Sequence, residues 1–158
     1  MKSRHPHQYL GIVRQMATIA SLVLILASCA TVPMAPPAED AAAKKFEVPP
    51  GKALVYVFRN TSFGAAIRFD LSVNGKPIGK SARYTYFVVE AQPGPITIKA
   101  EAENTTEMVV NAEAGKIYWV NQEVRLGFIM ARVGLTQVVE DEGRKAVAEC
   151  QLASRVQM

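Results

Sequence analysis

The feature that most constrains the fold is a series of short apolar runs, each as long as a β-strand and each bounded by turn residues. Between residues 67 and 73, apolar side chains alternate with polar ones, which predicts a strand with one buried and one solvated face. Asn74-Gly75 follows directly, and this dipeptide favours a tight hairpin because both residues tolerate positive φ. Residues 96–103 repeat the alternation after a Pro-Gly turn.

This pattern predicts a mostly β fold, an antiparallel β-sandwich of about seven to eight short strands with a short C-terminal helix. Residues 54–59 are apolar on both faces, which is typical of a central strand. The last two strands are expected at residues 128–133 and 135–139, with a break at Gly134. Acidic residues at 140–142 suit the N-terminus of the closing helix.

The first 28 residues are organised like a secretion signal. Residues 1–15 are polar and basic, and residues 16–27 form a single apolar run. A membrane-spanning helix needs roughly 20 apolar residues, so this run has the length of a signal peptide. It ends in Leu26-Ala27-Ser28-Cys29.

Leu26-Ala27-Ser28-Cys29 resembles the lipobox of bacterial lipoproteins. The resemblance implies that the Cys29 thiol receives diacylglycerol, that the leader is cut before Cys29, and that the new amino group is acylated, typically with palmitate. Two or more acyl chains anchor a protein stably in a membrane. By the same resemblance, Ala30 implies transport to the outer membrane, where the domain is expected to face the periplasm.

Residues 29–50 are expected to connect the lipid to the domain as a disordered tether. They are rich in Ala and Pro, and no hydrophobic period persists. Fully extended, about 20 residues reach at most roughly 70 Å, so the domain could stand off from the lipid. The expected organisation is therefore a cleaved signal peptide (1–28), a lipidated tether (29–50) and a sandwich domain (51–158).

Charge and composition exclude several functions. Three of the 18 Lys and Arg residues lie in the leader, whereas all 14 Asp and Glu residues follow it, so the mature chain is nearly neutral. We therefore expect no nucleic-acid partner. His5 and His7 are both in the leader, so the mature chain lacks the commonest general base and metal ligand. No metal or cofactor is expected.

Cys150 is the one thiol left in the mature chain once Cys29 carries lipid. It falls on one face of the expected helix with Ala146 and Val147. A reactive cysteine needs a cation, a histidine or a helix N-terminus beside it, and Cys150 lies late in the helix. Burial against the sandwich is expected, with an intermolecular disulfide as the alternative.

Five aromatic residues form the candidate binding surface: Tyr84, Tyr86, Tyr118, Trp119 and Phe128. Exposed aromatics on a sheet can stack on sugar rings of peptidoglycan or anchor a protein interface. Aromatic residues also favour strands for packing reasons alone, so a position in the core is the alternative.

Much of the chain resembles a lipoprotein family that carries domain of unknown function 2846. The strings that carry the resemblance are PPGKALVYVFR, FDLSVNGK, YFVVEAQPG, AGKIYWVNQEV, GFIMAR and EDEGRKAVAECQLA. They lie within residues 46–153, and their turns also resemble the PEGA and transthyretin-like sandwich modules. The resemblance implies an envelope lipoprotein with a β-sandwich, and it implies no activity and no site residue.

The sequence therefore predicts a membrane-anchored envelope lipoprotein whose sandwich is a non-enzymatic module. Its expected partners are the membrane, through the Cys29 lipid, and an envelope protein or peptidoglycan. The first alternative is a periplasmic thiol-active protein or enzyme that uses Cys150. The second is an architectural subunit of an envelope complex.

Overall fold

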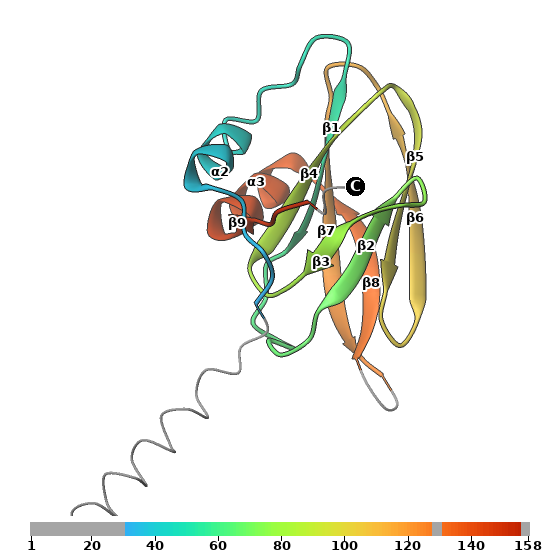
Figure 1. The fold of residues 1–158 in the computed structure, drawn as a ribbon. Helices are drawn as coiled ribbons and strands as arrows, with labels where there is room; N and C mark the ends of the chain where they lie inside the picture. The colour runs from blue at the N-terminus through green and yellow to red at the C-terminus, as the bar shows by residue number, and fades with distance from the viewer. Residues whose placement is uncertain (1–30, 128–130, 156–158) are drawn as a thin grey trace, which may run out of the picture.

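The computed structural model describes residues 31–127 and 131–155, which form a two-layer β-sandwich with helices on one outer face (Figure 1). This confirms the predicted mostly β fold with a closing helix. One layer has the strand order β8-β7-β1-β4-β9, and the other has the order β3-β2-β5-β6. The elements are α2 (Pro37–Ala43), β1 (Ala53–Arg59), β2 (Phe69–Val73), β3 (Lys76–Ser81), β4 (Thr85–Ala91), β5 (Gly94–Glu101), β6 (Thr105–Ala112), β7 (Ile117–Leu126), β8 (Ala131–Val138), α3 (Glu140–Glu149) and β9 (Gln151–Leu152).

The five-stranded sheet is mixed, whereas the sequence predicted antiparallel pairing throughout. β1 lies antiparallel to β4 but parallel to β7, with Leu54 opposite Ile117. β9 lies parallel to β4 at its edge. After β4 the chain adds β5 and β6 to the four-stranded sheet, and it then returns to the five-stranded sheet to place β7 parallel to β1.

The main core lies between the two sheets. Alternate residues of each strand point into it, as the period of two along a strand requires. β2, for example, buries Phe69, Leu71 and Val73 and leaves Asp70 exposed. The predicted one-sided strand after residue 67 is therefore correct.

A second core covers the opposite face of the five-stranded sheet. All seven residues of β1 are buried, which agrees with its prediction as a central strand. Leu54, Tyr56 and Phe58 point away from the sandwich interior, and α3 packs over them with Ala146 and Val147. A strand buried on both faces is expected to be apolar throughout.

The predicted disordered tether is wrong for residues 31–50, which we call the N-terminal belt. The belt packs along the outer face of the five-stranded sheet and contains helix α2 (Figure 1). Met34 forms an antiparallel bridge with Ala153, and the Ala35 amide donates to the Leu152 carbonyl at 2.9 Å. The Ala and Pro content suggested disorder, but tertiary contacts to β9 and the sheet hold the segment in place.

β8 is one continuous strand rather than two strands broken at Gly134. A Cβ at Gly134 would lie 2.8 Å from the Arg125 guanidinium, so the glycine makes room for a neighbouring side chain. Gly143 has a similar role in α3, where a Cβ would lie 2.3 Å from Trp119 Cγ. Gly143 is therefore explained by close packing against a buried ring, whereas the guanidinium beside Gly134 is the exposed end of a flexible side chain that can move. Neither glycine breaks its element.

Candidate functional site

Asp40 connects the belt to the sheet. Its Oδ1 accepts hydrogen bonds from Tyr86 Oη and from the Leu152 amide, each at 2.9 Å, and its Oδ2 pairs with Lys44 Nζ at 2.9 Å. Burial alone would raise the pKa of this carboxyl, but the bonds from Lys44, Leu152 and Tyr86 hold it below its ordinary value of 3.8. The sequence analysis missed Asp40, although Pro37 at the helix start and acids in the first turn are helix signals.

Two of the five candidate aromatics lie in the second core and form no surface. Tyr86 is fully buried and Trp119 is 2% exposed. Tyr56 stacks between them, with ring centroids 5.9 Å from Tyr86 and 4.8 Å from Trp119. Phe46 of the belt closes the cluster edge-on, 5.4 Å from Tyr56. The expectation that Tyr86 and Trp119 form an exposed surface for sugar stacking is therefore wrong, because the belt and α3 cover their rings.

The phenols of this cluster are held neutral by burial. Burial raises the pKa of Tyr56 to about 12, while Arg144 opposes the shift. Burial and the Asp40 carboxylate also raise the pKa of Tyr86. Tyr56 Oη donates to the Ala43 carbonyl at 2.6 Å. These hydroxyls therefore act as hydrogen-bond donors that dock the belt, not as acid–base groups.

Cys150 is buried beneath the belt, as expected from its helix face. It is 1% exposed, and its Sγ lies 3.8 Å from the Arg59 carbonyl. Burial raises the pKa of its thiol to about 12, which leaves almost no thiolate near neutral pH. The arrangement is that of a packed structural cysteine.

A second residue that the sequence analysis missed is Arg59, whose side chain is fully buried inside the sandwich. Its guanidinium donates to three carbonyls of the loop that follows β1, at 2.8 Å to Ile67, 3.1 Å to Phe63 and 2.6 Å to Gly64. In the described part of the chain it has no carboxylate partner. Burial lowers its pKa, yet a guanidinium remains charged at physiological pH.

The remaining aromatic candidates have different positions. Tyr84 is 40% exposed in the turn between β3 and β4, with φ of 51°. Tyr118 is half-buried against the main core, and its hydroxyl accepts a bond from the Glu113 amide at 3.0 Å. Phe128 and Cys29 both lie outside the described residues, as do Leu26, Ala27 and Ser28. Among the described members of this set, Tyr84 is therefore the only exposed aromatic.

Tyr84 borders a surface hollow of about 490 Å³ at the end of the sandwich where the belt begins. The sequence analysis did not predict this hollow, because it joins segments that are distant along the chain. The residues that line it are Thr31, Val32, Met34, Ala82, Arg83, Tyr84, Thr85, Glu149 and Gln151.

Residues 31–127 and 131–155 bring together no cluster of three or more His, Cys, Asp or Glu side chains that could hold a metal ion. Within the same ranges, no helix is long and apolar enough to cross a membrane. Beside Thr31, the exposed Tyr84 and Arg83 border the surface hollow.

The fold and this surface define a small two-sheet β module with an outer helical layer. The chain belongs to the family described as Protein of unknown function (DUF2846), which matches residues 49–135. It is also similar to a protein of Haemophilus influenzae described as "Uncharacterized protein", with 34% identity over 139 residues, which cover 87% of this chain and 83% of that protein.

Proposed function

We propose that this protein is an envelope lipoprotein, anchored through a lipid on Cys29, whose β-sandwich is a non-enzymatic interaction module. The observation that carries the proposal is the order of basic segment, apolar run and Leu26-Ala27-Ser28-Cys29 directly before the belt. Ala30 favours the outer membrane, with the domain in the periplasm. The partner of the sandwich is an envelope protein or peptidoglycan.

The positions of the candidate groups support a binding role over a catalytic one. The thiol of Cys150 is buried with a raised pKa, which weighs against the alternative of a thiol-active protein. The phenols of Tyr56 and Tyr86 are bonded within the core. The mature chain also contains no histidine, so the usual proton-transfer group is missing.

The anchoring is tested by labelling cells with an alkyne analogue of palmitate and comparing the wild type with Cys29→Ser. We expect label on the wild-type protein and none on the variant, together with release of the variant from the membrane fraction. Label that persists on Cys29→Ser would contradict the anchor.

The interaction role is tested by crosslinking the lipidated protein in intact cells and identifying what is captured. A discrete protein or peptidoglycan fragments, lost with Cys29→Ser, would support an anchored interaction module. A Cys150→Ser strain with the Cys29→Ser phenotype would instead favour thiol chemistry. Stable recovery in one large complex would favour the architectural alternative.

A further inference from the structure

One end of the sandwich, which we call the base, lies where the described chain begins. The base consists of Thr31, the β1–β2 loop (60–68), the β3–β4 turn (82–84) and Leu126. β1 and β7 both run toward this end and β4 starts from it, as their pairing requires. Figure 1 shows the belt beginning at the same end as these loops.

The base exposes apolar side chains. Phe63 is 53% exposed, Tyr84 is 40% exposed and Leu126 is 85% exposed. Scattered exposed apolar residues are ordinary on a protein surface, but several at one end indicate an interaction surface. Phe63 is also held in place, because its carbonyl accepts a hydrogen bond from the buried Arg59 at 3.1 Å.

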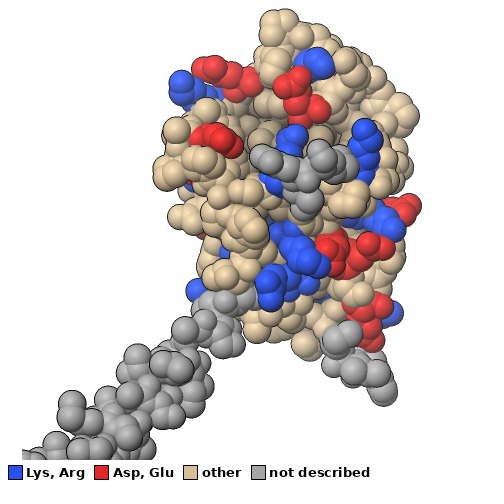
Figure 2. Space-filling view, in the orientation of Figure 1, with Lys and Arg blue, Asp and Glu red and all other residues tan. Residues whose placement is uncertain are grey.

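Two exposed arginines lie beside the start of the belt. Arg68 Nη1 donates to the Thr31 carbonyl at 3.2 Å, and Arg83 lines the same hollow as Thr31. Among the described residues, neither arginine has a carboxylate within salt-bridge distance. Glu149 also borders the hollow, where its carboxylate accepts a bond from Asn60. Figure 2 shows a group of Lys and Arg side chains beside the start of the described chain.

The spacing between anchor and fold is short. Cys29 precedes Thr31 by two residues, and two extended residues span at most about 7 Å. The bilayer is about 40–45 Å thick with a hydrocarbon core of about 30 Å, which leaves about 5–8 Å of headgroup on each side. A lipid on Cys29 therefore brings Thr31 to the outer edge of the headgroup layer. Because the belt is packed rather than extended, it provides no further reach.

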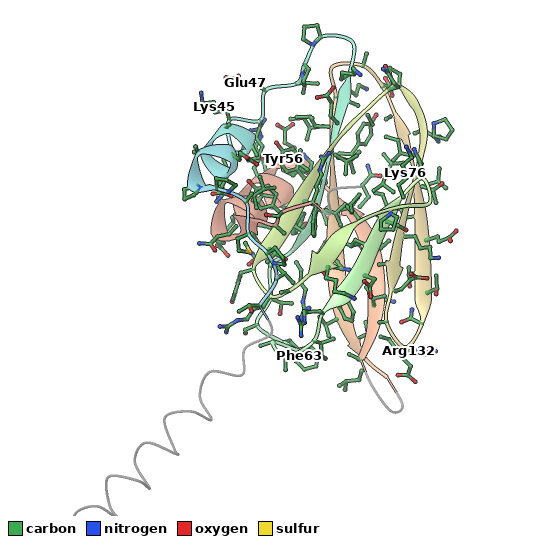
Figure 3. All side chains as sticks on the ribbon, viewed as in Figure 1. Lys45, Glu47, Tyr56, Phe63, Lys76 and Arg132 are labelled. Atoms are coloured by element: carbon green, nitrogen blue, oxygen red, sulfur yellow. The ribbon has the colours of Figure 1, made fainter. Side chains whose placement is uncertain are left out.

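We propose that the base rests on the phospholipid surface that holds the anchor. Phe63 and Tyr84 enter the interfacial layer, where aromatic side chains are favoured, and Arg68 and Arg83 contact headgroup phosphates. This inference rests on the proposed lipidation of Cys29. It implies that the domain is held at the membrane in one orientation, with the end that carries Lys76 facing away (Figure 3).

The test uses the lipidated mature protein in vesicles of phosphatidylethanolamine and phosphatidylglycerol. A fluorophore is attached at Ser62→Cys, which keeps Phe63, or at Lys76→Cys as the matched control at the opposite end. Cys150 is buried, so labelling is selective. We expect brominated lipid to quench the probe at position 62 several-fold more than the probe at position 76, and aqueous iodide to show the reverse. Equal access of iodide to both probes would overturn the proposal.

A charge-reversal variant tests the headgroup contacts. Arg68→Glu with Arg83→Glu should lower quenching by brominated lipid several-fold at position 62, whereas Lys45→Glu with Lys76→Glu should leave it unchanged. Circular dichroism confirms that both variants fold, and equal effects of the two variants would overturn the role of the arginines.

Mass spectrometry shows whether the protein carries lipid, and so distinguishes failure of the proposed function from failure of the proposed orientation. A protein without lipid overturns the proposed function, whereas a lipidated protein with a water-exposed probe at position 62 overturns only the orientation.

Discussion

Tyr86 Oη donates a 2.9 Å hydrogen bond to Oδ1 of Asp40, although the two residues are 46 positions apart. The same oxygen accepts from the Leu152 amide, and the other carboxylate oxygen pairs with Lys44. One side chain thus connects the belt to β4 and β9. This carboxylate therefore docks the belt together with the backbone bridge between Met34 and Ala153.

Replacing Asp40 should loosen the belt. Asp40→Ala leaves the Leu152 amide without its acceptor and the Tyr86 hydroxyl with only the 3.3 Å contact to the carbonyl of residue 40, and an unpaired buried donor costs about 1–3 kcal/mol. Urea unfolding of the leaderless Cys29→Ser chain measures this loss. Asp70→Ala is the matched control, because Asp70 forms an exposed pair with Lys80 that is worth about 0–1 kcal/mol. Equal losses in the two variants would contradict the role assigned to Asp40.

Acid should weaken the same contact. The folded-state pKa of Asp40 lies below its ordinary value of 3.8, so its contribution to stability is fully present above that value. The contribution is lost as the pH falls through the lower, folded-state pKa. The difference in unfolding free energy between wild type and Asp40→Asn should therefore shrink below about pH 3.8. A difference that stays constant down to low pH would show that the charge is not involved.

Arg59 should fix the loop that carries Phe63. Arg59→Ala removes hydrogen bonds to the carbonyls of Ile67, Phe63 and Gly64, and we expect a loss of about 3 kcal/mol since bonds to charged groups are the stronger ones. Hydrogen exchange should speed up most in residues 60–68. Arg132→Ala, at an exposed position, is the control and should leave exchange in that loop unchanged. Unchanged protection in Arg59→Ala would contradict the assignment.

Gly143→Ala should destabilise the protein, although alanine normally favours a helix by about 1 kcal/mol. The new Cβ would lie 2.3 Å from Trp119 Cγ, and overpacking of this kind costs about 1–3 kcal/mol. Urea unfolding gives the sign of the change, and the emission spectrum of Trp119 reports whether its ring moves. A stabilised variant with unchanged Trp119 emission would show that α3 has room at this position.

Cys150 should react with thiol reagents only after unfolding. The residue is 1% exposed, so the reagent cannot reach its thiol. Burial also raises the pKa of the thiol to about 12, so almost none of it is the reactive thiolate near neutral pH. Ellman's reagent, added to the leaderless Cys29→Ser chain, measures the rate with and without urea. Ser62→Cys provides an exposed thiol for comparison. Fast labelling of Cys150 in the native chain would revive the thiol-active alternative.

The sequence predicted the strands of the sandwich because their signals are local. Alternation over residues 67–73 and the Asn74-Gly75 turn needed no knowledge of the rest of the chain. The two predicted strands around Gly134 form one strand, because pairing with β7 continues through the glycine, with Glu123 opposite Gly134. A contact across strands leaves no mark in the local pattern.

The belt and the aromatic cluster could not be predicted in the same way. Composition suggested a tether, yet Asp40 and Phe46 find partners on strands that follow much later in the sequence. Burial of both faces of β1 did indicate that something covers the sheet, but not which segment. For the same reason, the alternation of β4 could not tell whether Tyr86 faced solvent or a covering layer.

The bridge between Met34 and Ala153 also has a consequence for the order of folding. It joins segments at the two ends of the described chain, so the belt can dock only after the segment around Ala153 is in place. Contacts between residues this distant in sequence form slowly, because the entropy of closing the long loop must first be overcome. The strands of the sandwich can therefore pair before the belt docks, so completion of the second core is a late step of folding.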